Sequence, residues 1–496
     1  MDLRLKRERV EFLSCLIHRS TEDAFTSDAV IRDTLPDADE VVFTNGDFCL
    51  WRLDLSNGMA ECEGEWKGSV CYCAEETGVL CSFPVSVGVR MRIHDDKIVP
   101  ELKPYASFQV TELSAQLMNS RKIRVRVRVK MTLRAYQADE LEYSTDVEDM
   151  SEDLFQKTEK TSCSVITSVE EQVFTAADSL KLRSLPQDGI LAAGSEVIAE
   201  APMRSGSRAV VRGHVATHLL YQSEEQATPV YETIETPFSQ LLDIHDDIGN
   251  ETLMTGLQLT SSSIHLTEDG TLETEFHIVA QTICAHELQI SALTDVYSVA
   301  DSLTLEPETM VTERWIAQET VITTAEVAVS NSKEISGVIA SSAQLRSFQK
   351  TESGYSGTVT IAALSQRTDG RLVEFRTEAP LLLEVISDCE VYDLQIALPE
   401  VTLAGEQVRV QISVAAQTVT AERKNTACLR SVSREGPDPM LGMLPSLTLK
   451  HIEEDEDLWS VAKQYASSVA AIQAANPQLS EGTGGGLCLI PRIVVG

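Results

Sequence analysis

Few residues of this chain have the type and spacing that chemistry at a site requires. Two His-Asp-Asp runs, at 94–96 and 245–247, each carry an imidazole and two carboxylates, a set that can hold a divalent metal ion. Asp is also an ordinary turn residue, and each run follows a segment whose pattern indicates a hairpin. The sequence motifs of serine hydrolases, zinc proteases and nucleotide-binding enzymes are absent. We therefore expect no catalytic residue, no metal and no cofactor.

Eleven cysteines are scattered along the chain, and four of them lie close together, at Cys62, Cys71, Cys73 and Cys81. A structural zinc site takes two closely spaced cysteine pairs, and this spacing does not supply them. Cys71 and Cys73 would share one face of a strand. We expect reduced cysteines that act as small apolar residues, with a metal site as the alternative.

Five consecutive acids, at 453–457, precede a segment with helical periodicity. Its apolar residues recur at i, i+3, i+4 and i+7, at Leu458, Val461, Ala462 and Tyr465. A second short helix would begin at Val469 and end before Pro477. Strands over 447–452 and 487–491 would flank the helices. The acids would then lie in the loop ahead of the first helix, where they suit a basic protein surface or simply solubilise the unit.

Composition limits the classes of partner. The chain has 496 residues, 43% hydrophobic and 24% charged, which is typical of roughly three or four globular domains. A net charge of −35 repels nucleic acid and anionic lipid. The apolar run at 12–17 is shorter than a secretory signal requires, and no segment is long and apolar enough to span a membrane. We expect a cytoplasmic protein.

An internal repeat organises the first 430 residues or so. Similar segments, each an aromatic residue, a Ser or Thr, an Asp, alternating apolar residues and a Pro, begin at Phe25, Phe174 and Tyr297. Their separation far exceeds the period of about 20–50 residues of a solenoid and suits whole domains. We expect an N-terminal segment over 1–24, β modules over 25–160, 165–296 and 297–432, a linker over 433–446, and a small α+β domain over 447–494.

The periodicity within these modules predicts strands. Segments 66–87, 211–244 and 362–386 each indicate a hairpin. In 121–136 apolar residues alternate strictly with basic ones, which is typical of a half-buried strand, and 272–286 and 406–423 occupy the corresponding late position in the other modules. The expected fold class is mainly β, with three tandem sandwich-like or barrel-like modules and a small βααβ domain.

The basic face of the strand at 121–136 is a possible partner surface. It carries Arg124, Arg126 and Arg128 on one side. With so negative a chain, we favour an edge or solvent face neutralised by nearby acids, such as those at 138–153, over a polyanion site. If the face has a functional use, a protein is the expected partner.

The C-terminal segment resembles a LysM domain. The landmarks are Leu-Trp-Ser-Val-Ala at 458–462, Asn-Pro at 476–477 and Ile-Pro at 490–491. The resemblance implies a groove for N-acetylglucosamine polymers, but Asp455, Glu456 and Asp457 stand where the family usually has Gly-Asp-Thr. The groove residues implied are Asp455, Glu456, Asp457, Leu458, Asn476, Pro477, Gln478, Leu479 and Ile490.

An array of such β modules followed by one LysM resembles the SPOCS-domain family of spore-forming bacteria (SipL-like proteins). The matching residues are at 32–42, with an Asp-x-x-Pro-Asp pattern, at 117–129, where Ser120 replaces a family proline, at 213–221 and at 292–301. The resemblance implies a sporulation scaffold in the mother-cell cytosol. Its LysM would dock a spore-coat morphogenetic ATPase (SpoIVA-like) or another coat protein at the forespore surface. The alternative is a peptidoglycan-binding protein of the wall or cortex, and an enzyme is not expected.

Overall fold

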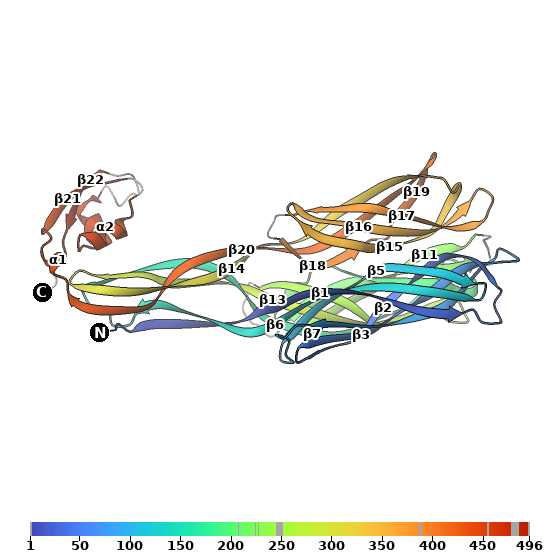
Figure 1. The fold of residues 1–496 in the computed structure, drawn as a ribbon, viewed down its shortest axis with the longest axis horizontal. Coiled ribbons are helices and arrows are strands. Elements are labelled where there is room, and N and C mark those ends of the chain that lie inside the picture. The colour runs from blue at the N-terminus through green and yellow to red at the C-terminus, as the bar shows by residue number, and fades with distance from the viewer. Residues whose placement is uncertain are drawn as a thin grey trace.

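The computed structural model describes residues 2–206, 208–223, 225–226, 228–244, 251–385, 389–453, 456–477 and 486–494. The chain is mainly β and forms several sheets. Figure 1 shows an elongated molecule: a broad body of strands at one end, a narrow stalk of long strands, and a small unit with two helices at the other end. Both chain termini lie near this small unit.

The body strands fall into three consecutive sets. The first set is β1 (Leu5–Val30), β2 (Ala38–Ser56), β3 (Met59–Ala74), β4 (Leu80–His94), β5 (Lys103–Asn119) and β6 (Lys122–Val147). The second is β7 (Leu154–Lys181), β8 (Pro186–Ala199), β9 (Met203–Ser205), β10 (Arg208–Ser223), β11 (Val230–Asp243), β12 (Glu251–Leu266) and β13 (Thr271–Ser298). The third is β14 (Asp301–Ser330), β15 (Ile335–Thr351), β16 (Gly354–Arg367), β17 (Leu372–Glu384), β18 (Cys389–Ile396), β19 (Glu400–Ala404) and β20 (Gln407–Pro437).

Strand pairing follows the same plan in each set. The first and last strands, which are the longest, pair antiparallel as β1–β6, β7–β13 and β14–β20. Three intermediate strands form a separate small sheet: β2-β3-β4, β8-β10-β11 and β15-β16-β17. A further strand, β5, β12 or β18, pairs with the last strand and ends the larger sheet. The larger sheets of the first two sets join through Leu13 and Ile166 into one sheet of order β12-β13-β7-β1-β6-β5.

The predicted strands are confirmed, and the barrel alternative is wrong. The three expected hairpins are β3–β4, β10–β11 and β16–β17. In β6 the alternate apolar side chains from Ile123 to Leu133 are fully buried, as the sequence pattern predicts. All described sheets are open, because each has two edge strands and none closes on itself.

The predicted module boundaries stay a prediction. The observed strands do not all begin or end at these boundaries. Phe25 and Phe174 occupy equivalent places late in β1 and β7, where they pair with Val127 and Ile278. Tyr297 instead lies at the end of β13, before the third set begins. Residues 5–24 belong to β1, and β20 continues through 437 into the expected linker.

The three sets pack around one shared core. Phe43 and Cys71 of the first set are ladder partners, as are Ala192 and Leu220 of the second and Ala340 and Leu364 of the third. These six buried residues belong to a single apolar cluster. Each small sheet also packs against the larger sheet of another set. Strand β2 packs against β12, and β15 packs against β5. The small sheet of the second set contacts the third set, where Glu196 of β8 accepts a hydrogen bond from the Ile396 amide of β18. The body is therefore one packed unit.

Candidate functional site

The C-terminal unit has the predicted order of elements. After the short helix α1 (Pro439–Gly442), β21 (Leu447–Ile452), α2 (Leu458–Gln464), α3 (Val469–Ala475) and β22 (Gly486–Pro491) follow in turn, and β21 pairs antiparallel with β22. We call residues 447–494 the terminal unit. Its core is small and apolar, built from Ile452, Val461, Ala462, Ile472 and Ile490.

Three of the predicted groove residues support the fold of the unit. The Asn476 side chain donates to the carbonyls of Ile472 at 2.7 Å and Leu489 at 2.6 Å, and accepts from the Leu489 amide at 2.8 Å. It thereby joins α3 to β22 at a buried position. Ile490 is 1% exposed and lies in the core, and Leu458 packs against that core. These side chains offer little surface to a partner.

The rest of the predicted groove is only partly described. Pro477 is exposed at the end of α3. Asp455, Gln478 and Leu479 lie outside the described residues.

The two described acids of the predicted groove, Glu456 and Asp457, are engaged within the chain. Glu456 pairs with Lys450 of β21, and this contact lowers the pKa of the Glu456 carboxyl. Asp457 caps α2 by accepting from the Trp459 amide at 3.2 Å and pairs with Lys157 of β7 at 3.1 Å. Partial burial opposes ionisation of Asp457, but Lys157 and the hydrogen bonds outweigh it and lower its pKa. Glu456 therefore makes its contact within the terminal unit, whereas Asp457 makes one contact with the long strand β7.

A specific contact between α2 and the end of β13 docks the terminal unit. Trp459 Nε1 donates to Asp295 at 2.8 Å, and its indole lies edge-on to Tyr297 with ring centroids 4.8 Å apart. Lys463 also pairs with Asp295 at 2.7 Å. The buried Tyr297 hydroxyl donates to the Ser467 carbonyl at 2.8 Å. Sequence reasoning missed this contact, because its two sides lie far apart in the chain.

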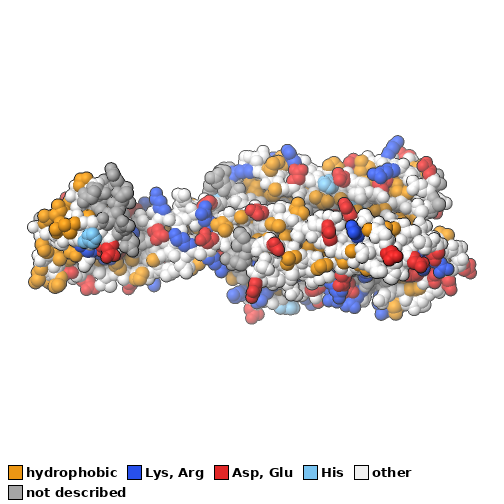
Figure 2. Space-filling view, turned by 90° about the horizontal axis from the view of Figure 1, so that it is seen from above, with side chains coloured by type: hydrophobic (Ala, Val, Ile, Leu, Met, Phe, Trp, Pro, Cys, Tyr) orange, Lys and Arg blue, Asp and Glu red, His pale blue; other side chains and the backbone are white. Residues whose placement is uncertain are grey.

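The opposite side of the terminal unit is an exposed apolar surface. Alternate residues of β21 and β22 point outward, and Leu449 lies directly opposite Leu489 in the ladder. Figure 2 shows apolar side chains gathered at this end of the molecule. We call the following residues the apolar tip: Met440, Met443, Leu447, Leu449, Leu487, Leu489 and Val494, which are 38–78% exposed. The alternating leucines at 447–449 and 487–489 were the available sequence signal.

The arginines of β6 are neutralised, as expected, but by different acids. Arg124 forms two hydrogen bonds with Asp28 of β1, at 2.7 and 3.0 Å. Arg126 and Arg128 approach Glu112 of β5 at 3.8 and 3.1 Å. β6 lies between β1 and β5 and is not an edge strand, so the acids come from these neighbours and not from 138–153.

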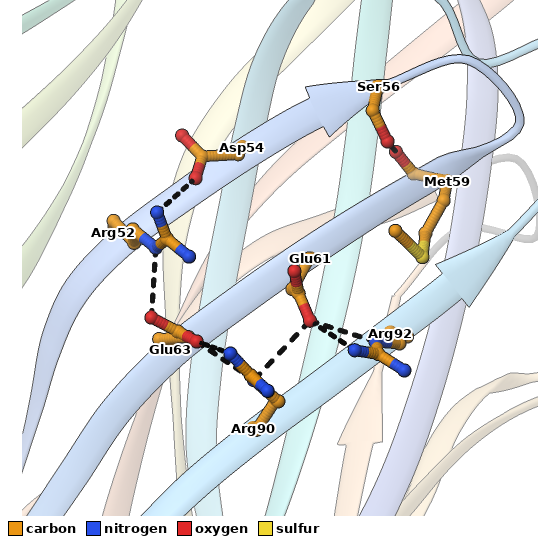
Figure 3. Close-up of polar contacts among 8 residues, drawn as sticks. All are labelled: Arg52, Asp54, Ser56, Met59, Glu61, Glu63, Arg90 and Arg92. Atoms are coloured by element: carbon orange, nitrogen blue, oxygen red, sulfur yellow. Dashed lines mark hydrogen bonds and ion pairs between the residues drawn. The ribbon is translucent and has the colours of Figure 1, made fainter.

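The small sheet of the first set carries a similar network on its solvent face (Figure 3). Arg52 pairs with Glu63 at 2.9 Å, Arg92 with Glu61 at 2.7 Å, and Arg90 bridges both glutamates. Basic and acidic side chains alternate across three strands. Such a face does not favour a polyanion.

The remaining sequence candidates have structural surroundings. Asp95 accepts from Arg19 at 3.3 Å and from the Lys97 amide at 3.1 Å, which closes the turn after β4. The second His-Asp-Asp run, at 245–247, lies outside the described residues. Cys71 and Cys73 are buried and share the apolar cluster between the three sets. Within the described ranges, no group of three or more His, Cys, Asp or Glu is arranged to hold a metal ion.

No helix in the described part of the chain is long and apolar enough to cross a bilayer.

Comparisons with protein-family models, with curated proteins and with solved structures gave no match.

Proposed function

We propose that the protein is a non-enzymatic scaffold of bacterial sporulation. It helps to assemble the spore coat in the mother-cell cytosol, through protein–protein contacts at the forespore surface. In this proposal the body is three tandem modules of the SPOCS type, and the terminal unit is a LysM-like module that docks a coat morphogenetic ATPase or another coat protein. The resemblance of the sequence supports the biological setting, and the structure of the terminal unit supports the mode of binding.

The apolar tip is the observation that carries the proposal. A large apolar patch on a soluble protein marks an interaction surface, because its exposure to water is costly. Covering half of each of these side chains would contribute about 1 kcal/mol per residue. The tip therefore offers several kcal/mol to a protein with a matching apolar surface.

The position of the tip suits docking of a large partner. β21 lies on the outer side of the terminal unit, while α2 faces the stalk (Figure 1). The loop that resembles a sugar-binding loop is on the side of the terminal unit that faces the stalk. There Asp457 contacts Lys157 of β7, and Trp459 contacts Asp295 of β13. A partner can therefore reach the tip without displacing these contacts.

The glycan-binding alternative rests on the order of elements, strand–helix–helix–strand, which this unit shares with LysM modules. The engaged Glu456 and Asp457 count against glycan binding at this loop, because a sugar approaching it would have to replace their charged partners.

The test is binding of the full-length protein to two immobilised targets, the purified coat morphogenetic ATPase and bare peptidoglycan. We expect retention by the ATPase, and at least a tenfold loss for Leu449→Glu. Ile322→Glu is the matched control, because Ile322 is 69% exposed on β14, away from the terminal unit. Retention by peptidoglycan alone, unaffected by Leu449→Glu, would replace the proposal with the alternative. A fluorescent fusion that stays diffuse throughout sporulation would exclude the scaffold.

A further inference from the structure

A cavity of about 300 Å³ lies between the three strand sets of the body. The strands that border it include β2, β5, β8, β12, β15 and β18, and each of these six is the edge strand of its sheet. Its volume is at the lower end of the range for small-molecule sites. The cavity is remote from the apolar tip and plays no part in the docking proposed above.

Equivalent positions of the three sets contribute polar side chains to this cavity. Asp47 of β2, Glu196 of β8 and Gln344 of β15 all line it. Their ladder partners on the neighbouring strands are Lys67, Ala216 and Thr360, respectively. Four residues further along the same strands are the core residues Cys71, Leu220 and Leu364. The three polar residues therefore occupy equivalent positions in their sets. The packing of the three sets thus brings three related polar positions together, and Asp393 of β18 adds a further carboxyl.

Among the described residues, no Lys or Arg pairs with the carboxyl groups of the cavity. No Lys or Arg lines the cavity among the described residues; its titratable lining residues are Asp47, Tyr105, Glu196, His218 and Asp393. Burial raises the pKa of Asp47 to about 6 and that of Glu196 to about 7, and it also raises the pKa of Asp393. Burial lowers the pKa of His218, so this imidazole supplies no positive charge at neutral pH.

Three further polar atoms in the lining residues lack partners. Trp66 Nε1, Tyr105 Oη and Ser342 Oγ are buried and make no hydrogen bond among the described residues. Trp66 and Tyr105 are 0% and 2% exposed, and Ser342 is 8% exposed. Leaving such a group unsatisfied costs about 1–3 kcal/mol, so the walls of the cavity carry polar groups that the other described residues do not satisfy.

We propose that this cavity binds a small organic cation of the polyamine class. The described acids do not form a metal-binding group, and they come from different sheets, so one compact ion would not reach them together. A chain that carries several ammonium groups can place one near each carboxylate.

The apolar part of the lining suits the methylene segments of such a chain. Phe48, Phe108, Val110, Leu257 and Leu345 also line the cavity. A simple metal ion would gain nothing from these apolar walls.

The test is calorimetric titration of the full-length protein with spermidine at about pH 7.5 and about 150 mM salt, where surface attraction is screened. Because the chain carries a net charge of −35, weak attraction to any polycation is expected at many sites. The proposal requires one saturable site per chain. Asp47→Asn and Glu196→Gln should each weaken it at least tenfold, whereas Glu384→Gln, an exposed acid on β17, should leave it unchanged.

Two controls make the outcome decisive. The neutral chain 1,8-octanediol should not bind, and both cavity variants should melt at or above the temperature of the unmodified protein, because each removes a buried charge that has no cationic partner. Unsaturable binding, or equal weakening by Glu384→Gln and the cavity variants, would overturn the proposal and leave the cavity to water.

Discussion

The contact that docks the terminal unit leads to a quantitative prediction. Asp295, near the end of β13, accepts from Trp459 Nε1 at 2.8 Å and from Lys463 Nζ at 2.7 Å. Asp295→Ala removes both bonds at once, together with the bond that the Val296 amide donates to the same carboxylate. Trp459→Phe removes the indole N–H together with the five-membered ring and keeps a six-membered ring near Tyr297, whose centroid lies 4.8 Å from that of Trp459. Combining the two variants isolates the bond between Asp295 and Trp459.

The structure sets the expected magnitude. A hydrogen bond to a charged group contributes about 1.5–3 kcal/mol. Asp295 and Trp459 are partly shielded from solvent, so we expect a coupling free energy of about 1.5 kcal/mol, in the range measured for residues in direct contact. Asp295→Ala alone should destabilise the docked unit by about 2 kcal/mol, since Lys463 loses its partner as well.

The assay is hydrogen exchange of the α2 and α3 amides in the native protein, read by mass spectrometry. This measures the local free energy of opening, so it does not require the whole chain to unfold in one step. Glu287→Ala is the control, because Glu287 lies on β13 in an exposed pair with Arg314 at 2.9 Å. Effects of Asp295→Ala and Trp459→Phe that add to within about 0.3 kcal/mol would refute the docking contact.

Three other predictions follow from individual side chains. Asn476→Ala should destabilise the terminal unit by about 2–3 kcal/mol in the same exchange assay, because it leaves buried groups of Ile472 and Leu489 unpaired. The pKa values of Glu456 and Asp457 are lower in the folded chain than in the unfolded one. The stability that these two carboxylates contribute is therefore present above the unfolded pKa of about 4 and is lost as the pH falls through the lowered values. Hydrogen exchange of the α2 amides, measured along an acid titration, would show this loss, and Lys450→Met should make the loss smaller. The pKa of Asp47 is instead raised to about 6, so ionisation of this carboxyl destabilises the fold at pH values above its unfolded pKa. Asp47→Asn should therefore stabilise the body by up to about 3 kcal/mol at about pH 7 and have little effect at about pH 4. Thermal melts at the two pH values would measure both effects.

Much of the secondary structure could be predicted, because a strand or helix leaves its period in adjacent residues. The alternation from Ile123 to Leu133 indicated β6, and the spacing of Leu458 and Val461 indicated α2. The same local patterns indicated the three hairpins and the order of elements in the terminal unit. They could not show which strand lies beside which, and so the acids that pair with Arg124 and Arg128 were sought at 138–153 and not on β1 and β5.

The candidate site was less predictable for the same reason. The sequence alone indicated a terminal unit with an acidic loop ahead of its first helix. Only the tertiary structure placed Asp295 against Trp459, and Asp47 near Glu196 in one cavity. A periodic pattern states which face of an element avoids water, whereas the partner that covers that face depends on packing between residues far apart in the chain.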